Sequence, residues 1–169
     1  MADDVTTISS NTSWLNYNGG GTQDSDTPPD NATSGLGTGP TLNVTNGALL
    51  EISGYLNLNA ATLNITDGAT VSVVPNGLLG GDLTNAAGGT VNIDGGTLTL
   101  SNEFNGNQSV YNITNGTLSV GNDFNGNQGV YNIYKGGVLD AGTNYSNINA
   151  GRYNIDADFS HLRQFRVIL

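Results

Sequence analysis

Two acidic residues at equivalent positions of a repeated stretch are the first candidates for chemistry in this 169-residue chain. Glu103 lies in Ser101-Asn-Glu-Phe-Asn-Gly-Asn-Gln108, and Asp123 lies in the matching Gly121-Asn-Asp-Phe-Asn-Gly-Asn-Gln128. If the stretches stack, both carboxylates come within reach of one hard cation such as calcium. The period is 20 residues (123 − 103), however, and the Gly-Gly-x-Gly-x-Asp pattern of calcium-binding nonapeptide repeats is missing. We therefore favour a solvated turn and expect no cofactor.

The basic residues that acid–base catalysis would need are few. Cleavage of a polysaccharide requires clustered carboxylates with a Lys, Arg or His nearby. His161 is the only histidine and lies beside Arg163 and Arg166 near the end of the chain, while Lys135 sits in an expected turn. The acidic residues do not recur in a cleft-forming pattern. We predict that the chain is not an enzyme and that His161 is a polar residue of the terminal segment.

A tandem repeat must position these residues. Gly96–Asn115 is followed at once by a near copy, Gly116–Lys135, so the period is 20 residues (132 − 112 for the equivalent Asn). An Asn followed by Ile or Val, with Gly four residues after the Asn, begins a copy at Asn43, Asn64, Asn92, Asn112 and Asn132. Asn154 begins a sixth copy, in which Asp158 replaces the Gly. Repeats of this length indicate a stack of solenoid units.

Each copy reads as three short strands. Apolar residues flank every Asn at a spacing of two, which places them on one face of a strand and the Asn on the other. A turn such as Asn115-Gly116 follows, then a second alternating strand, then a third apolar position at Phe104 or Phe124. Asn-Gly turns also suit antiparallel hairpins, but identical strands at a fixed spacing stack best on themselves. We predict an all-β fold, a parallel β-helix (β-solenoid) of about six coils of ~20 residues.

This fold makes three further predictions. Core residues should be buried, with Phe104 stacked on Phe124 in the next coil; the aliphatic ones are Leu98, Leu100, Ile113, Leu118, Val120 and Ile133. The Asn residues should form a hydrogen-bonded ladder outside one sheet. The step of 28 residues from Asn64 to Asn92 predicts an insertion within Leu79–Gly89.

The stretch Val110-Tyr-Asn-Ile-Thr-Asn-Gly-Thr-Leu-Ser-Val-Gly-Asn-Asp-Phe124 resembles a known type of repeat. It is similar to the Gly/Asn/Thr-rich repeats of autotransporter-type passenger domains and other bacterial surface β-solenoids, over about residues 41–155. The resemblance implies that the parallel β-helix is right-handed. It also implies a location outside the cell, on a bacterial surface or in an extracellular matrix.

The segments outside residues 41–156 differ in composition, and we expect residues 1–40 to be an N-terminal extension or cap and 157–169 a C-terminal cap or assembly segment. A solenoid exposes an unpaired sheet edge and an open core at each end. Trp14 and Tyr17 could plug the first end or offer an aromatic platform for sugars. The apolar tail could fold back as a cap or dock head-to-tail on another copy. The candidate assembly residues are Trp14, Tyr17, Phe165, Val167, Ile168 and Leu169.

Composition excludes several partners. Fourteen acidic residues against four basic ones give a net charge of −10, which repels nucleic acid and anionic lipid. No apolar run approaches the ~20 residues that span a bilayer, and cysteine is absent. The first residues lack a basic, then apolar, leader. We interpret the chain as exported and stripped of its signal rather than cytosolic.

Our leading hypothesis is a non-catalytic structural or adhesive β-solenoid of the bacterial surface or extracellular matrix. Its partners would be other copies, joined head-to-tail as a filament subunit, or surface glycans and proteins. The alternative is a carbohydrate-binding or carbohydrate-cleaving β-helix, including a fragment of a phage tailspike. Exposed aromatic residues beside a groove with acidic partners would favour the alternative.

Overall fold

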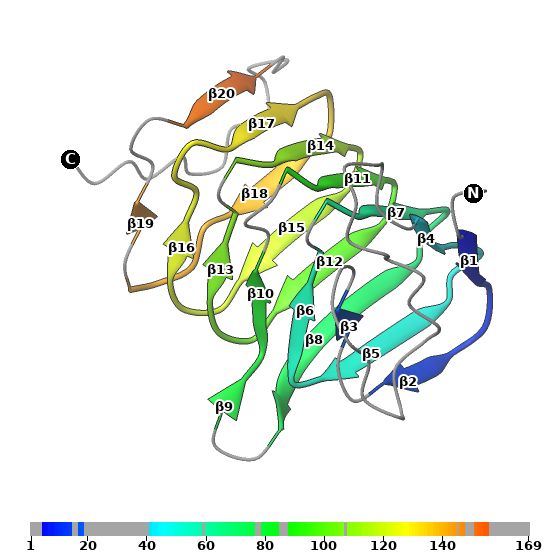
Figure 1. The fold of residues 1–169 in the computed structure, drawn as a ribbon. Helices are drawn as coiled ribbons and strands as arrows, with labels where there is room; N and C mark the ends of the chain where they lie inside the picture. The colour runs from blue at the N-terminus through cyan, green and yellow to red at the C-terminus, as the bar shows by residue number, and fades with distance from the viewer. Residues whose placement is uncertain are drawn as a thin grey trace.

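The structure is a computed structural model that describes residues 5–14, 17–18, 41–58, 60–76, 79–84, 88–106, 108–144, 146–147 and 151–155. Within these ranges the chain is all-β and contains no helix. Its strands pair in parallel and stack in three sheets, apart from one short antiparallel pair of strands (Figure 1). The predicted parallel pairing is confirmed, and an antiparallel meander is ruled out for the repeats.

The chain visits the three sheets in turn. Sheet A contains β1 (Val5–Ile8), β4 (Thr41–Val44), β7 (Thr62–Thr66), β11 (Thr90–Asp94), β14 (Val110–Thr114), β17 (Val130–Ile133) and β20 (Arg152–Ile155). Sheet B contains β2 (Thr12–Trp14), β5 (Leu49–Ser53), β8 (Thr70–Asn76), β12 (Thr97–Leu100), β15 (Thr117–Val120) and β18 (Val138–Asp140). Sheet C contains β3 (Tyr17–Asn18), β6 (Tyr55–Asn57), β10 (Asp82–Thr84), β13 (Phe104–Asn105), β16 (Phe124–Asn125) and β19 (Ser146–Asn147). We call three consecutive strands, one in each sheet, a copy. This arrangement fits a β-solenoid.

Alternation along each strand separates core from surface. In β14, Tyr111 and Ile113 are buried, whereas Val110, Asn112 and Thr114 are partly exposed on the other face. Strands β4, β7, β11, β12, β15 and β17 show the same pattern. Because successive side chains of a strand point to opposite faces, this period of two lets each strand contribute two residues to one core.

The repeated glycines have two different physical roles. Gly47 and Gly68 adopt φ angles of +69° and +74°, a left-handed conformation that glycine reaches at no steric cost. Gly116, at the equivalent position of a later copy, is needed for close approach instead. A Cβ atom there would lie 2.5 Å from Cγ2 of Ile93 and 2.7 Å from the carbonyl oxygen of Gly96. Glycine thus recurs at this position of the motif, but the conformation requires it in the early copies and close packing requires it in the later one.

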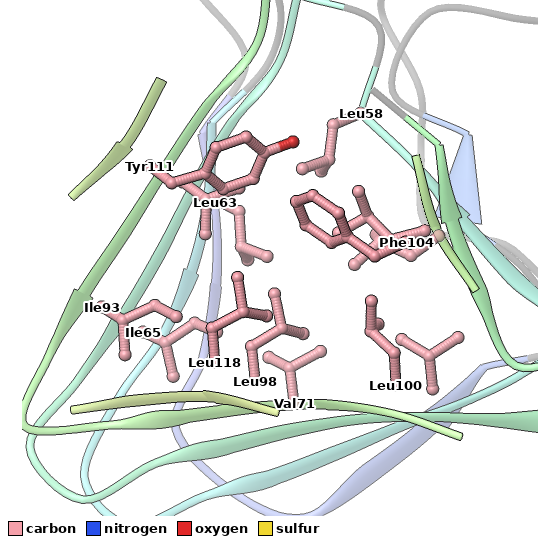
Figure 2. Close-up of a cluster of buried hydrophobic side chains, with 14 of the residues drawn as sticks. Leu58, Leu63, Ile65, Val71, Ile93, Leu98, Leu100, Phe104, Tyr111 and Leu118 are labelled. Carbon is pink, nitrogen blue, oxygen red and sulfur yellow. The ribbon is translucent and has the colours of Figure 1, made fainter. Parts of the chain in front are cut away.

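The core fills the space that the three sheets enclose (Figure 2). Tyr111 from sheet A and Phe104 from sheet C point toward each other, while Leu98 and Leu118 approach from sheet B. All six aliphatic residues that we predicted to be buried are buried, and the most exposed of them is Ile133, at 7%. Full burial of one such side chain contributes about 1.5–3 kcal/mol, so the core accounts for much of the driving force for folding.

Aromatic side chains stack in columns through the later copies. The centroids of the Phe104 and Phe124 rings lie 4.7 Å apart and the ring planes differ by 5°, which confirms the predicted stack. Phe104 also packs against Tyr111, with ring centroids 5.0 Å apart and tilted by 57°. Gly126 makes room for these rings, since a Cβ atom there would come within 2.5 Å of Cε1 of Phe124 and 2.7 Å of the Tyr153 hydroxyl oxygen. Aromatic stacking and glycine thus depend on each other here.

Residues 5–18 carry strands that the repeat pattern does not reveal. Our sequence analysis set residues 1–40 apart from the repeats as an extension or cap. In the structure β1 continues sheet A, with Thr7 opposite Asn43 and Ile8 opposite Val44. β2 and β3 extend sheets B and C in the same way. The described part of this segment therefore adds one strand to every sheet.

The insertion between Asn64 and Asn92 begins earlier than predicted. Val73 and Leu100 are paired equivalents, as are Leu83 and Phe104. Ten positions separate Val73 from Leu83, and only four separate Leu100 from Phe104, so six extra residues fall in this interval. They prolong β8 to Asn76, where it pairs antiparallel with β9 (Leu79–Gly80). The insertion therefore overlaps the predicted range Leu79–Gly89 only in part, because strand β8 itself lengthens before it, which a repeat period cannot show.

The core makes a direct prediction for Ile113→Asp. This change places an uncompensated charge on a fully buried site and should lower the free energy of unfolding by about 3–5 kcal/mol. Thr99→Asp is the matched control, because Thr99 faces outward between Ser72 and Ser119. Urea denaturation followed by circular dichroism measures both. Equal loss of stability in the two variants would contradict the assigned register.

Candidate functional site

The Asn ladder is a column of asparagine side chains on the outer face of sheet A. Its members are Asn43, Asn64, Asn92, Asn112, Asn132 and Asn154. Neighbouring members stand directly opposite each other in the backbone register. Each Nδ2 donates a hydrogen bond to Oδ1 of the preceding member, at N···O distances from 2.6 to 2.8 Å. The ladder predicted from the sequence is confirmed.

The hydrogen bonds of the Asn ladder all run in one direction, toward the N-terminal end of the stack. An amide suits this because it carries a donor and an acceptor on one short side chain. Bonds aligned in a chain polarise one another. At one end, Nδ2 of Asn43 donates to Oγ1 of Thr7 at 3.5 Å. At the other end, Asn154 donates to Asn132 and presents its own Oδ1 as an acceptor group. The two ends of the ladder therefore differ chemically.

A second column of polar side chains lies at the corner between sheets B and C. Nδ2 of Asn102 donates to Oδ1 of Asp82 at 2.7 Å, and Nδ2 of Asn122 donates to Oδ1 of Asn102 at 2.8 Å. Asn144 continues the column, donating to Asn122 at 3.3 Å. The direction is again N-terminal. Polar side chains of this chain therefore bond mainly to their counterparts in neighbouring copies.

The turn after β7 holds an acidic side chain that accepts hydrogen bonds from two hydroxyl groups. The hydroxyl groups of Thr45 and Thr66 donate to Oδ2 of Asp67 at 2.7 and 3.1 Å. These hydrogen bonds, that from Thr45 first, lower the pKa of Asp67, which is exposed to solvent. They brace the turn, and they leave the carboxylate charged at neutral pH.

Three tyrosines form a column inside the stack. The rings of Tyr111 and Tyr131 lie 4.9 Å apart, and those of Tyr131 and Tyr153 lie 4.7 Å apart, both nearly parallel. Burial raises the pKa of Tyr153 to about 12. Burial, and secondarily the neighbouring phenols Tyr111 and Tyr153, raises the pKa of Tyr131 further. The phenols of Tyr131 and Tyr153 are therefore neutral at physiological pH, and the column contributes packing to the core.

The candidate calcium ligands share a corner with a third acid. Glu103 and Asp123 are neighbours, because Phe104 pairs with Phe124, and Asp82 occupies the same column one copy earlier. Oδ1 of Asp82 accepts from Nδ2 of Asn102 and, at 3.0 Å, from the backbone N–H of Glu103. Across the described ranges, three or more metal-binding side chains do not gather at any point. The absence of a cofactor stays a prediction.

Most of the catalytic and assembly candidates lie outside the part of the chain that the structure describes. His161, Arg163 and Arg166 lie outside the described residues, and Lys135 is exposed in a turn. Trp14 belongs to β2, at the outer edge of sheet B, and Tyr17 to β3, at the outer edge of sheet C; their side chains are not described. The other predicted assembly residues also lie outside the described ranges, namely Phe165, Val167, Ile168 and Leu169.

The described residues add candidates at the two ends that sequence reasoning missed. Val5 in β1 is 58% exposed, and Ile155 in β20 is 39% exposed although its equivalents in earlier copies are buried. Thr7 terminates the Asn ladder. The run of β-branched residues Val5-Thr-Thr-Ile8 is the signal that could have identified the first of these strands.

Comparison with protein-family models, with curated proteins and with solved structures finds no match to this chain. A search of the described residues for a helix that is long and apolar enough to cross a membrane also finds none. The site must therefore be interpreted from its own geometry. That geometry consists of two polar ladders along the sides and apolar residues at the ends.

The Asn ladder predicts a pH-dependent defect in Asn112→Asp. The new carboxylate can accept from Asn132 but has no donor for Oδ1 of Asn92, so folding should raise its pKa above the unfolded value of ~3.9. The loss of stability relative to wild type, about 1–3 kcal/mol at pH 7, should shrink as pH falls toward 4, because the protonated acid donates again.

Urea denaturation at pH 7 and pH 4 measures this difference. The matched control is Asn115→Asp, on an exposed turn beside Lys135, which should change stability by less than ~0.5 kcal/mol. A defect of Asn112→Asp that is independent of pH would mean that the lost donor is not its cause.

The corner of Glu103 and Asp123 predicts no specific calcium site. A cation bound only by the folded chain would raise the melting temperature in a saturable way. We expect calorimetry in millimolar calcium, against the same ionic strength of sodium chloride, to show no such rise. A saturable shift that Asp123→Asn abolishes would overturn this prediction.

Proposed function

We propose that this chain is a non-catalytic structural or adhesive β-solenoid of a bacterial cell surface or extracellular matrix, which assembles with its own copies through its ends. In this proposal residues 41–156 form about six coils of a right-handed parallel β-helix, and β1–β3 add to the stack at its N-terminal end. Connections between parallel strands of one sheet are almost always right-handed, which supports the chosen handedness.

The observation that carries the proposal is the distribution of exposed apolar side chains. Three of the most exposed large apolar residues lie on terminal strands: Val5 on β1 at 58%, Val138 on β18 at 48% and Ile155 on β20 at 39%. The sheet sides present mainly the Asn ladder and rows of Thr and Ser, although Leu49, Tyr55 and Tyr134 are also exposed there. Apolar area is what protein contacts bury, so the ends are better suited to association than the sides.

A structural role also agrees with how the polar side chains are used. Catalysis needs polar groups that converge on a cleft and remain available to a substrate. In the described copies the amides bond to equivalent amides above and below. Tyr55 is exposed in β6 of sheet C and Tyr134 directly after β17 of sheet A, so these aromatic residues do not build a sugar platform together. This arrangement stabilises a rod rather than a binding cleft.

An extracellular setting is supported by the sequence. Its Gly/Asn/Thr-rich repeats resemble those of bacterial surface β-solenoids. The net charge of −10 keeps such a rod soluble and disfavours nucleic acid as a partner. Besides other copies, surface glycans or proteins are the partners that this proposal allows.

The terminal segments complete the proposal. The fourteen residues after Ile155 (169 − 155) end in the apolar sequence Phe165-Arg-Val-Ile-Leu169. We assign this tail to the assembly contact, with the region of Trp14 and Tyr17 on the receiving copy. β-Strand addition would supply the contact, since backbone pairing gives affinity and alternate side chains give specificity. A head-to-tail contact does not close on itself and therefore builds a fibre.

Sedimentation velocity and electron microscopy test this function. We expect the full-length chain to form species larger than the 17.4 kDa monomer as its concentration rises, and to appear as rods that extend end to end. Deleting Arg163–Leu169 should shift the distribution toward monomer, because the tail is the apolar part of the proposed contact.

The control is Tyr55→Ser, which removes an exposed aromatic from the side of sheet C and should leave the distribution unchanged. A full-length chain that remains monomeric at the highest attainable concentration would contradict the assembly proposal and would make the tail a cap.

A further inference from the structure

Sheet A has a free edge at each end of the described stack. β1 is its first strand and β20 is its last, and within the described ranges each pairs on one side only (Figure 1). The outer edge of a strand presents unpaired N–H and C=O groups, which are a template for another strand. Parallel pairing is the pattern of the whole sheet, so a strand added to either edge would continue it.

The Asn ladder distinguishes the two edges. Its last member is Asn154, which donates through Nδ2 to Asn132 and thus leaves Oδ1 as the acceptor group of the ladder at the β20 edge. At the β1 edge Thr7 Oγ1 accepts from Asn43, and a hydroxyl group that accepts one hydrogen bond can donate another. The β1 edge thus offers a donor and the β20 edge an acceptor. Two β20 edges would bring two acceptors together, which disfavours a tail-to-tail dimer.

The side chains of the two edges match in register. Successive strands place Ile8 in the same inward column as Ile155, and Thr7 in the same outward column as Asn154. If β1 followed β20, its Ile8 would cover Ile155, which is 39% exposed. The same register would align the hydroxyl of Thr7 with Oδ1 of Asn154.

We propose that a second copy of this chain docks with its β1 parallel to β20, in the register that pairs Val5 with Arg152 and Thr7 with Asn154. The Asn ladder then runs unbroken from one copy into the next and gives the assembly its polarity. This inference rests on the proposed self-assembly and adds its register and direction. Sheets B and C end one strand earlier, at β18 and β19, so the pairing is proposed for sheet A.

The contact is small. Four paired residues bury far less than the roughly 1,600 Å² of a standard interface, so association through this contact alone is weak. An equilibrium assay could miss a weak complex, whereas a covalent trap records it. Disulfide trapping is well suited because the chain contains no cysteine of its own.

The test mixes two single-cysteine variants of the full-length chain, Val5→Cys and Arg152→Cys, under mild oxidation. In the proposed register their Cα atoms lie about 4.8 Å apart, within the range that a disulfide spans. The control replaces Val5→Cys by Ser9→Cys, which lies four residues along, just beyond β1, where the Cα separation is more than about 10 Å. We expect a cross-linked heterodimer from the first mixture and loss of that product from the second.

The hydroxyl of Thr7 has its own test. Thr7→Val in the Val5→Cys variant should lower the yield of cross-link to Arg152→Cys about fivefold, the equivalent of one net hydrogen bond of about 1 kcal/mol, whereas Thr7→Ser should restore it. Unfolding of Thr7→Val by urea checks that the monomer keeps its stability. Equal yields with and without Thr7→Val would overturn the role of the ladder.

The outcomes separate this inference from the proposed function. Assembly in sedimentation with heterodimer in neither mixture, or in both equally, would overturn the β1–β20 register and leave end-to-end assembly standing. A chain that stays monomeric and does not cross-link would overturn both. Cross-linking confined to Val5 with Arg152 is the result that supports the junction.

Discussion

Hydrogen bonding between parallel strands that are one copy apart is the interaction on which the rest of this structure depends. It places each residue directly against its counterpart in the next copy, as Asn112 stands against Asn92 and Asn132. A favourable contact between two copies is therefore repeated along the stack: aliphatic residues form core columns, Phe104 stacks on Phe124, and amides form a ladder. Backbone pairing sets the geometry of the stack. Side chains that pack or hydrogen-bond well against an identical side chain determine which register is stable.

This constraint explains the unusual composition. Charged side chains in register would stand against like charges on adjacent strands, which is destabilising. Only 11% of residues are charged, and the outer faces are built from Asn, Thr and Ser. The column of Asp82, Glu103 and Asp123 is an exception, and there Asp82 receives hydrogen bonds from an amide and a backbone N–H. Uncharged polar residues with both a donor and an acceptor are the side chains that a repeating stack can use without limit.

The same constraint concentrates interaction at the ends. Along the sides, the side chains of each copy are satisfied by the copies above and below, but the terminal strands β1 and β20 have a neighbour on one side only within the described ranges. Apolar residues that are buried in the middle of the stack become partly exposed there, as Ile155 does. Because the hydrogen bonds of the Asn ladder all run in one direction, the two ends of the stack are not equivalent. Polarity of assembly can therefore follow from an internal hydrogen-bond pattern, without a dedicated binding site.

The period, the strands of the later copies, the core columns and the Asn ladder could all be predicted from the sequence, because side-chain identity repeats there with the period of the fold. The pairing of β1 with the repeats could not, since 36 positions separate Thr7 from Asn43 and Thr replaces Asn. Nor could the extension of β8 into a hairpin with β9, or the single direction of the ladder. A pattern detects repeated side chains, whereas strand pairing needs only backbone groups, so the sequence determined what stacks and the tertiary structure decided where the stack begins and which way it points.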